Sequence, residues 1–221
     1  MKSDGSAVTN AVVFVGPSLG RDRVAELTNA KIADPIRRGD LALFPNCDKF
    51  LILDGEFGQN LSVSPKEILR LLDARKLVIG AASMGALRAS ELDSFGMLGI
   101  GWVYRRFARC SVRRDDDVAL IYSPLDFVPR TIPVVNVEYW METLRRQGTV
   151  TRLDAAAVVR VARKVFFTDR TEQKLVQALR TSFGDERVDY LLTKTAGDIP
   201  DVKAMDAEVA IRALEKSGGF G

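Results

Sequence analysis

The sequence predicts an α/β protein, with a doubly wound and mostly parallel sheet flanked by helices and with a helical C-terminal extension. Three observations predict this class. Short apolar runs rich in Val, Ile and Phe each end in a glycine-containing turn, as buried parallel strands do. Helical patterns separate these runs, and that alternation is typical of doubly wound sheets. Strand signals then fade after Val137, whereas helical patterns continue almost to the end.

The predicted strands are residues 11–15, 50–53 and 77–82, which read AVVFV, FLIL and LVIGAA. Residues 41–44 fit either a further strand or a packed loop. Residues 118–123 fit a strand near one edge of the sheet.

The best-defined helix of the first half begins at Ser64. Ser64 and Glu67 form the S-x-x-E pattern of a capping box, and Pro65 occupies the first helical position, where an N–H is not needed. We expect this helix to end near Arg75. Two further helices are predicted in this half, over residues 21–30 and 84–95.

The second half is predicted to be helical, over residues 139–147, 153–167, 172–183, 187–193 and 204–216. In the second of these helices, apolar residues recur every four positions, which predicts a core-facing stripe. They are Leu153, Ala157, Val161 and Val165. We therefore expect an α/β core domain over residues 1–135 and a helical region over residues 136–221 that packs on this core.

The composition is that of a globular protein and argues against several function classes. The 221 residues carry a net charge of +3, which is too small to indicate nucleic-acid binding by itself. The two cysteines, Cys47 and Cys110, lack CxxC spacing, which favours a reducing compartment. The apolar run at 11–15 is too short for a membrane span or a signal peptide. We therefore expect a cytoplasmic protein that binds neither membranes nor nucleic acid.

Histidine does not occur in the sequence. This rules out Ser-His-Asp and Cys-His catalytic schemes and every histidine metal site. Three consecutive acids, Asp115 to Asp117, do not replace such a site, because neighbouring side chains of an extended segment point apart. Asp116 is a candidate for orienting a catalytic group. We expect neither a metal nor a cofactor.

Ligands of parallel α/β sheets bind beyond the carboxyl ends of the strands. Here those ends carry Gly16-Pro17-Ser18, Asp54-Gly55-Glu56 and Ala82-Ser83-Met84-Gly85. Helices that begin nearby direct backbone N–H groups toward an anion or a developing oxyanion. The sequence thus predicts a strand-end site, with Asp54 and Glu56 as supporting polar groups.

Ser83 is the candidate nucleophile. It follows strand 77–82 and precedes Met84, Gly85 and a helix, which resembles a nucleophile elbow with Ala81 in place of the first glycine. A serine at a strand-to-helix junction is also a common helix N-cap. The spacing alone leaves both interpretations open.

Lys66 is the candidate partner of Ser83. A lysine in the first helical turn opposes the helix dipole, so helix propensity does not explain it there, and a serine-activating base does. The alternative is a solvated lysine. Glu67 is explained by the capping box and is assigned no chemistry.

A basic, aromatic-flanked stretch lies between residues 104 and 114. Three interpretations fit it: contact with RNA, a solvated face, or a docking surface for an acidic protein. Its arginines are Arg105, Arg106, Arg109, Arg113 and Arg114.

Several segments resemble the TfuA-like family, named for a component of trifolitoxin biosynthesis. The most specific is GAASMGALRASEL at residues 80–92, because a match of that length is improbable by chance. The other segments occur in the family's order, and they are VFVGPSL (13–19), DPIRRGDL (34–41), LDGEF (53–57), VSPKEIL (63–69), FGMLGIG (95–101) and DDDVAL (115–120).

This resemblance implies a protein that works with a YcaO enzyme in peptide thioamide formation. It implies one of two roles. In the first, the protein hydrolyses the C-terminal thiocarboxylate of a ubiquitin-like sulfur carrier protein and releases hydrosulfide. In the second, it is a non-catalytic activator that docks on the YcaO enzyme.

Under the first role, the resemblance implies Ser83 as the nucleophile and Lys66 as the base or anion-holder. Backbone N–H groups near Ser18 and Met84 would hold the oxyanion. Arg88 and Glu91 would brace the site or receive the carrier tail, and the basic stretch would receive the carrier. Members of the family often have histidine immediately before the lysine, where this chain has Pro65.

Overall fold

The structure is a computed structural model that describes residues 10–110, 114–195 and 197–217. The chain forms two compact units. The first contains the residues up to Cys110 and those from Asp206 onward, and the second contains the residues between them. The predicted domains, 1–135 and 136–221, stay a prediction, because these units are defined by contacts and not by independent folding.

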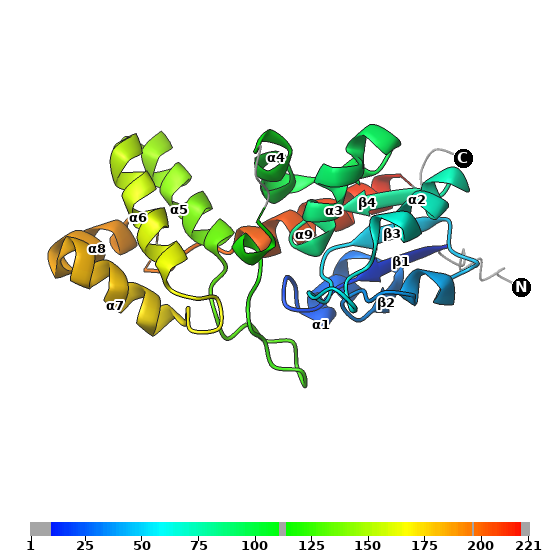
Figure 1. The fold of residues 1–221 in the computed structure, drawn as a ribbon, viewed down its shortest axis with the longest axis horizontal. Coiled ribbons are helices and arrows are strands. Elements are labelled where there is room, and N and C mark those ends of the chain that lie inside the picture. The colour runs from blue at the N-terminus through cyan, green and yellow to red at the C-terminus, as the bar shows by residue number, and fades with distance from the viewer. Residues whose placement is uncertain (1–9, 111–113, 196, 218–221) are drawn as a thin grey trace, which may run out of the picture. The chain divides into compact units, whose positions relative to one another are not determined.

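The first unit is built on a parallel sheet with the strand order β2-β1-β3-β4-β5 (Figure 1). Its strands are β1 (Ala11–Phe14), β2 (Lys31–Ala33), β3 (Lys49–Ile52), β4 (Leu77–Gly80) and β5 (Leu98–Gly99). Every described pairing within this sheet is parallel, so the predicted α/β class is confirmed. The predicted strands correspond to β1, β3 and β4. β2 and β5 were not predicted, because three and two residues are too few for a period of two to be recognised.

Five helices accompany this sheet among the described residues, and they are α1 (Arg21–Leu27), α2 (Pro65–Asp73), α3 (Met84–Leu92), α4 (Gly101–Arg109) and the later part of α9 (Val202–Lys216). Alternate residues of the central strands, such as Val13, Leu51 and Ile79, pack in one core with Val24 of α1 and Ile211 of α9. The strand residues between them are buried as well. Burial on both sides explains why these strands read as continuous apolar runs.

Two of the open strand assignments are settled by the structure. Residues 40–43 form a short 3-10 helix, and Phe44 after it packs edge-on against Phe14 of β1 at 5.5 Å between ring centroids. The segment was therefore the packed loop and not a strand. Residues 118–123 do not form a strand in the described structure, and a single bridge pairs Tyr122 with Pro129.

The second unit is helical, and its helices are α5 (Val134–Arg146), α6 (Arg152–Lys164), α7 (Glu172–Phe183) and α8 (Asp185–Thr193), followed by the first residues of α9. It has its own core, centred on the fully buried Trp140. The predicted stripe on α6 is wrong at Leu153, which is 83% exposed, whereas Val161 packs against the core and the most buried positions are Val158 and Ala162. A step of four residues drifts by about 40° around an α-helix, so a strict four-residue repeat leaves the buried face. In the described part of the chain, no helix is long and apolar enough to cross a membrane.

Candidate functional site

The predicted site lies at the point where the chain reverses the direction in which it adds strands to the sheet. The chain moves from β1 outward to β2 and then returns to β3 on the other side of β1. In doubly wound sheets this switch point, beyond the carboxyl ends of the strands, is where ligands bind. Gly16, Pro17 and Ser18 follow β1, and Asp54 follows β3, so the structure brings these predicted residues to one edge of the sheet.

Asp54 joins the loops that follow β1 and β3. One carboxylate oxygen, Oδ2, accepts from the N–H groups of Gly16 and Ser18, each at 2.9 Å. The other, Oδ1, accepts from the Ser18 hydroxyl at 2.6 Å. The side chain is only 2% exposed, and these bonds replace the water that burial removes. The Ser18 N–H is therefore occupied by Asp54, and this argues against its predicted role as an oxyanion donor.

Ser83 lies at the end of β4 in a tight turn. Its N–H donates to the Ala81 carbonyl at 2.8 Å and to the Leu53 carbonyl at 3.2 Å. The bond to Ala81 spans three residues and forces Ala82 between them to a φ of 63°, which is costly for a residue with a side chain. A nucleophile elbow is likewise a strained strand-to-helix turn. Here the positive φ falls on Ala82, one residue before the serine.

The Ser83 hydroxyl does not cap helix α3. Ser83 occupies the N-cap position, but its φ of −126° and ψ of −114° are accompanied by no side-chain capping bond. Instead, three of the first helical amides reach backbone carbonyls: Gly85 N–H donates to Leu53, Ala86 to Ala81 and Leu87 to Ser83. Within the described residues, the first amide of the helix, that of Met84, has no hydrogen-bond acceptor. The hydroxyl of Ser83 and this N–H are thus neighbours without a hydrogen-bond partner among the described residues, and both residues are buried, at 2% and 1% exposed.

The glycines around Ser83 serve close packing. A Cβ on Gly85 would lie 1.7 Å from the Ile52 carbonyl oxygen, and one on Gly80 would lie 2.1 Å from the Gly85 oxygen. Helix α3 therefore begins directly against β3 and β4. A Cβ on Gly55 would similarly lie 2.9 Å from Met84. These positions are already filled by protein atoms, so they do not line a groove for a substrate.

Lys66 is exposed at the second position of α2, and no hydrogen bond in the described residues joins it to Ser83. Glu67 beside it forms the predicted capping box with Ser64 and also accepts from the Gly39 N–H at 2.6 Å. Burial raises the pKa of Glu67, but the hydrogen bonds from Ser64 and Gly39 and the charge of Arg38 outweigh burial and lower it.

The remaining predicted polar residues of the first unit are engaged in ion pairs. Glu56 pairs with Arg37 at 3.5 Å. Arg88 is 14% exposed, and it donates to the Val63 carbonyl at 2.9 Å and pairs with Glu91 at 2.8 Å. Arg88 thus ties α3 to the segment that leads into α2, and its predicted role in bracing the site or receiving the carrier tail stays a prediction.

The predicted docking arginines lie in different parts of the chain. Arg105 and Arg109 are exposed and one turn apart on α4, whereas Arg106 between them is half-buried. Arg114 is exposed and belongs to the second unit, as does the exposed Asp116. Arg113 lies outside the described residues. No group of three or more metal-ligating side chains converges in the part of the chain that the structure describes.

One important residue was missed by the sequence interpretation. Asp206 of α9 is 5% exposed and accepts from the N–H groups of Trp102 and Val103, both at 2.7 Å, so it caps helix α4. Burial raises the pKa of Asp206, against the opposing effect of these two N–H groups and of Arg105. Because Asp206 is 104 positions from Trp102, no local sequence pattern could predict this cap.

No curated protein matches this chain. The family model described as TfuA-like protein matches residues 54–171, which is more than half of the chain. The match covers Asp54, Lys66, Ser83 and the DDDVAL segment, and it begins after the segments at 13–19 and 34–41. The chain belongs to the TfuA-like family, which is associated with YcaO enzymes in thioamide biosynthesis.

Proposed function

We propose that this protein supplies sulfur to a YcaO enzyme by hydrolysing the C-terminal thiocarboxylate of a ubiquitin-like sulfur carrier protein, with Ser83 as the nucleophile. The observation that carries the proposal is the geometry of residues 81–84. A strained turn holds Ser83 at the start of α3, its hydroxyl caps nothing, and the next backbone N–H has no acceptor within the described residues. A hydroxyl beside a free helix-terminal N–H is the pair that acyl transfer needs.

The proposed reaction has two steps, and the proton formed with the carboxylate in the second step goes to solvent. The Ser83 oxygen attacks the thiocarboxylate carbon, the C–S bond breaks, and the hydroxyl proton leaves on sulfur as hydrosulfide. Water then hydrolyses the acyl-serine ester, which gives the carrier carboxylate and restores the hydroxyl. The Met84 N–H would stabilise the oxyanion in both steps. The serine proton leaves with the sulfur, and the base that would remove it during attack is not assigned in this proposal.

Lys66 suits anion binding better than proton abstraction in this proposal. It is exposed on the first turn of α2 and has no bond to Ser83 among the described residues. An exposed ammonium attracts a thiocarboxylate or an acidic carrier without needing contact with the serine. Asp54 and Arg88 act as positioning residues, since they fix the β1 and β3 loops and the start of α2 around α3.

The exposed face of α4 is proposed to receive the carrier. Arg105 and Arg109 lie one turn apart and are both exposed. Charges of one sign on such a face accelerate encounter with an oppositely charged protein, and salt screens this effect. Replacing both with glutamate should slow capture of the whole carrier at low salt and leave a short thiocarboxylate peptide unaffected. Equal losses on both substrates would exclude the docking role.

The serine is tested by Ser83→Ala, with Ser90→Ala as the matched control. Ser90 lies within α3 and is buried, as Ser83 is. Its hydroxyl donates to the Leu87 carbonyl at 2.7 Å, and it has no role in the proposed reaction. We expect Ser83→Ala to abolish conversion of carrier thiocarboxylate to carboxylate, measured by intact mass, and Ser90→Ala to retain it. Full turnover by folded Ser83→Ala protein would overturn the mechanism.

The second candidate function is a non-catalytic activator of YcaO, and one observation favours it. Residues 121–130 form a hydrogen-bonded loop, in which Ser123 and Val128 are paired and Arg130 N–H reaches the Ile121 carbonyl at 2.7 Å. At its tip Leu125 is 93% exposed. An ordered loop with an exposed apolar tip is suited to docking. Retained thioamide formation by Ser83→Ala, with loss in Leu125→Asp, would establish this second function.

A further inference from the structure

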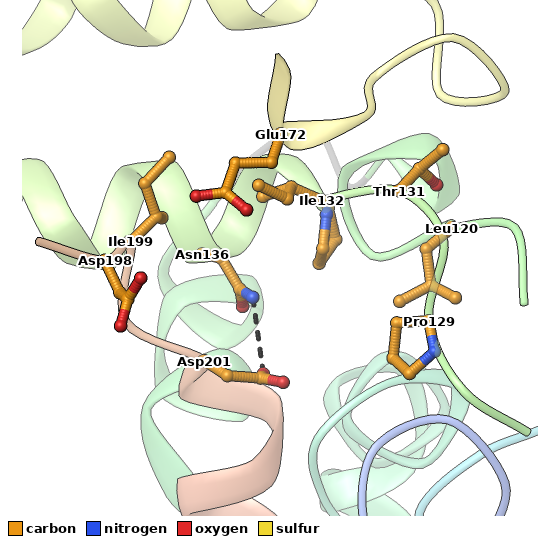
Figure 2. A pocket seen from close by; sticks show the side chains of 10 residues that line it. Leu120, Pro129, Thr131, Ile132, Asn136, Glu172, Asp198, Ile199 and Asp201 are labelled. Atoms are coloured by element: carbon orange, nitrogen blue, oxygen red, sulfur yellow. Dashed lines mark hydrogen bonds between the residues drawn. The ribbon is translucent and has the colours of Figure 1, made fainter. Parts of the chain in front are cut away.

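The second unit contains a pocket that is separate from the strand-end site. Its volume is about 250 Å³, far larger than the roughly 30 Å³ share of one water molecule. The apolar part of its lining comes from Leu120, Pro129, Ile132, Pro133 and Ile199. Figure 2 shows that the polar lining comes from the segment before α5, from α5 itself, from the start of α7 and from the segment that leads into α9.

Most polar side chains of the lining are hydrogen-bond acceptors, and the donors among them are the Asn136 amide and the Thr131 hydroxyl, which itself accepts from the Ile121 N–H at 2.8 Å. Three carboxylates line the pocket, those of Glu172, Asp198 and Asp201, and none of the described lining residues is a lysine or arginine (Figure 2). The two prolines have no N–H. The N–H groups of Ile132 and Asn136 donate to carbonyls elsewhere in the unit.

Asn136 supplies an independent observation. It is 6% exposed, and its Nδ2 donates to Asp201 Oδ1 at 3.3 Å, which fixes the orientation of the amide. Within the described residues its Oδ1 is buried without any hydrogen-bond donor. A buried acceptor without a donor costs free energy, and a ligand that brings a donor removes this cost.

The buried cations nearby do not satisfy these acceptors. Arg170 donates to the Ala162, Val165 and Ile132 carbonyls, and Lys203 donates to the Val118 carbonyl. Neither side chain lines the pocket. The carboxylates also do not converge as a metal site among the described residues. The ligand should therefore carry several N–H donors, a positive charge and an apolar stem.

We propose that this pocket binds a primary alkylammonium group, with its stem against Leu120, Ile132 and Ile199 and its ammonium among Asn136, Glu172 and Asp198. Such a group occurs in a lysine side chain and in a free small amine. Both sources present three N–H donors on an apolar stem. Asp201 is left out of the ammonium contacts, because its Oδ1 already caps the start of α9 through the N–H groups of Lys203 and Ala204.

The proposal is tested by titrating the isotope-labelled full-length chain and following the methyl NMR signals of Ile132 and Ile199, with Ile211 of the first-unit core as a reference. The probes are n-butylammonium, N-acetyl-lysine N-methylamide and its uncharged analogue N-acetyl-norleucine N-methylamide, at constant ionic strength. We expect saturable shifts with both amines and at least tenfold weaker binding of the norleucine compound. Tighter binding of the lysine compound than of butylammonium would identify a peptide lysine as the source, and equal binding would identify a free amine.

Variants separate the pocket from general surface charge. Glu172 is exposed, and Glu172→Gln should weaken amine binding about threefold, as expected for a solvent-exposed ion pair. Asn136→Leu should weaken it about tenfold, because a charged donor loses its buried acceptor. Glu186→Gln removes an exposed charge of α8 that does not line the pocket, and should change nothing. Equal binding of the norleucine compound, equal loss in Glu186→Gln, or absence of saturable shifts would each overturn the proposal.

Discussion

Asp54 accepts hydrogen bonds from both the backbone N–H and the hydroxyl of Ser18, at 2.9 and 2.6 Å. The two residues are 36 positions apart and follow the neighbouring strands β3 and β1. The carboxylate therefore takes the place that a bound anion occupies in many strand-end loops. It fixes two of the three loops from which the proposed site is built.

Replacing Asp54 should reveal how strongly this carboxylate holds the loops. In Asp54→Ala, the N–H groups of Gly16 and Ser18 stay buried without an acceptor, and we expect the free energy of unfolding to fall by about 3 kcal/mol. In Asp54→Asn, the amide oxygen can still accept from both N–H groups, so a loss of about 1 kcal/mol is expected. Asp73→Ala, at an exposed acid of α2, should have little effect.

The two tryptophans allow the first unit to be followed separately during urea unfolding. Trp102 belongs to the first unit and Trp140 to the second. Trp140 Nε1 has no hydrogen-bond partner in the described residues, so Trp140→Phe removes no hydrogen bond, but it leaves a cavity in the core of the second unit, and the Asp54 variants are therefore compared with the Trp140→Phe chain, in which Trp102 is the one tryptophan. Equal stability of Asp54→Ala and Asp54→Asn in this background would contradict the role given to the carboxylate.

Gly85→Ala should be far more damaging than an ordinary glycine substitution. Its Cβ would lie 1.7 Å from the Ile52 carbonyl oxygen, which is backbone and cannot move aside cheaply. We expect a loss of about 3 kcal/mol or more, at the upper end for overpacking. Gly20→Ala is the control, since nothing lies within 4 Å of its Cβ position, and its effect should stay below about 1 kcal/mol. Similar melting temperatures for the two variants would refute this packing.

Glu67→Gln should destabilise the protein in a pH-dependent manner. The carboxylate accepts from Gly39 and Ser64, and a neutral amide turns one of its ends into a donor that faces an N–H. We expect a loss of about 1 kcal/mol near pH 7. The pKa of Glu67 is lowered from its usual value of 4.5 in the folded protein, so the unfolded chain binds this proton more readily. The stability due to Glu67 is therefore present above pH 4.5 and is lost as the pH falls through the folded-state pKa.

Urea unfolding at a series of pH values tests this expectation. The difference between the wild-type chain and Glu67→Gln should shrink as the pH drops below 4.5. Glu186→Gln, at an exposed acid of α8, provides the reference for removal of a charge. A difference that stays constant down to low pH would show that Glu67 acts by shape and not by charge.

Lys66 is expected to act through its charge. Lys66→Arg should retain most carrier turnover, whereas Lys66→Ala should raise KM about fivefold and change kcat little, as loss of an exposed ionic contact does. Arg70→Ala, one turn further along α2, serves as the control. If instead Lys66→Arg lost about 10² in kcat, the lysine would be a general base, because arginine does not release its proton.

The parts of the fold that could be predicted were those with repeated local signals. The strands β1, β3 and β4 were recognisable as apolar runs. The start of α2 was recognisable from Ser64, Pro65 and Glu67. The two short edge strands gave too few residues for a pattern. On α6, a four-residue repeat was mistaken for the buried face, which lies at Val158 and Ala162.

The candidate site was predictable as a location and less so in its details. The predicted strand ends and the glycines beside them indicated Ser83 and Asp54 as site residues. They did not indicate that Asp54 binds the loop after β1 or that the Ser83 hydroxyl does not cap α3. Whether Ser83 caps α3, and whether the Ser18 N–H is free, depend on contacts between strands that are distant in the sequence. Local spacing cannot contain that information.

The position of α9 in the core bears on how the protein is made. Its residues Ala207, Ala210 and Ile211 pack with β1, β3 and β4, and Asp206 caps α4. All five strands therefore leave the ribosome before α9, the helix that completes their core, is synthesised. A chain that ends before α9 should expose this apolar face, bind a hydrophobic dye and be cleaved rapidly within residues 10–110. The nascent sheet therefore stays unfinished until α9 is synthesised, and the four helices α5 to α8 emerge during that delay.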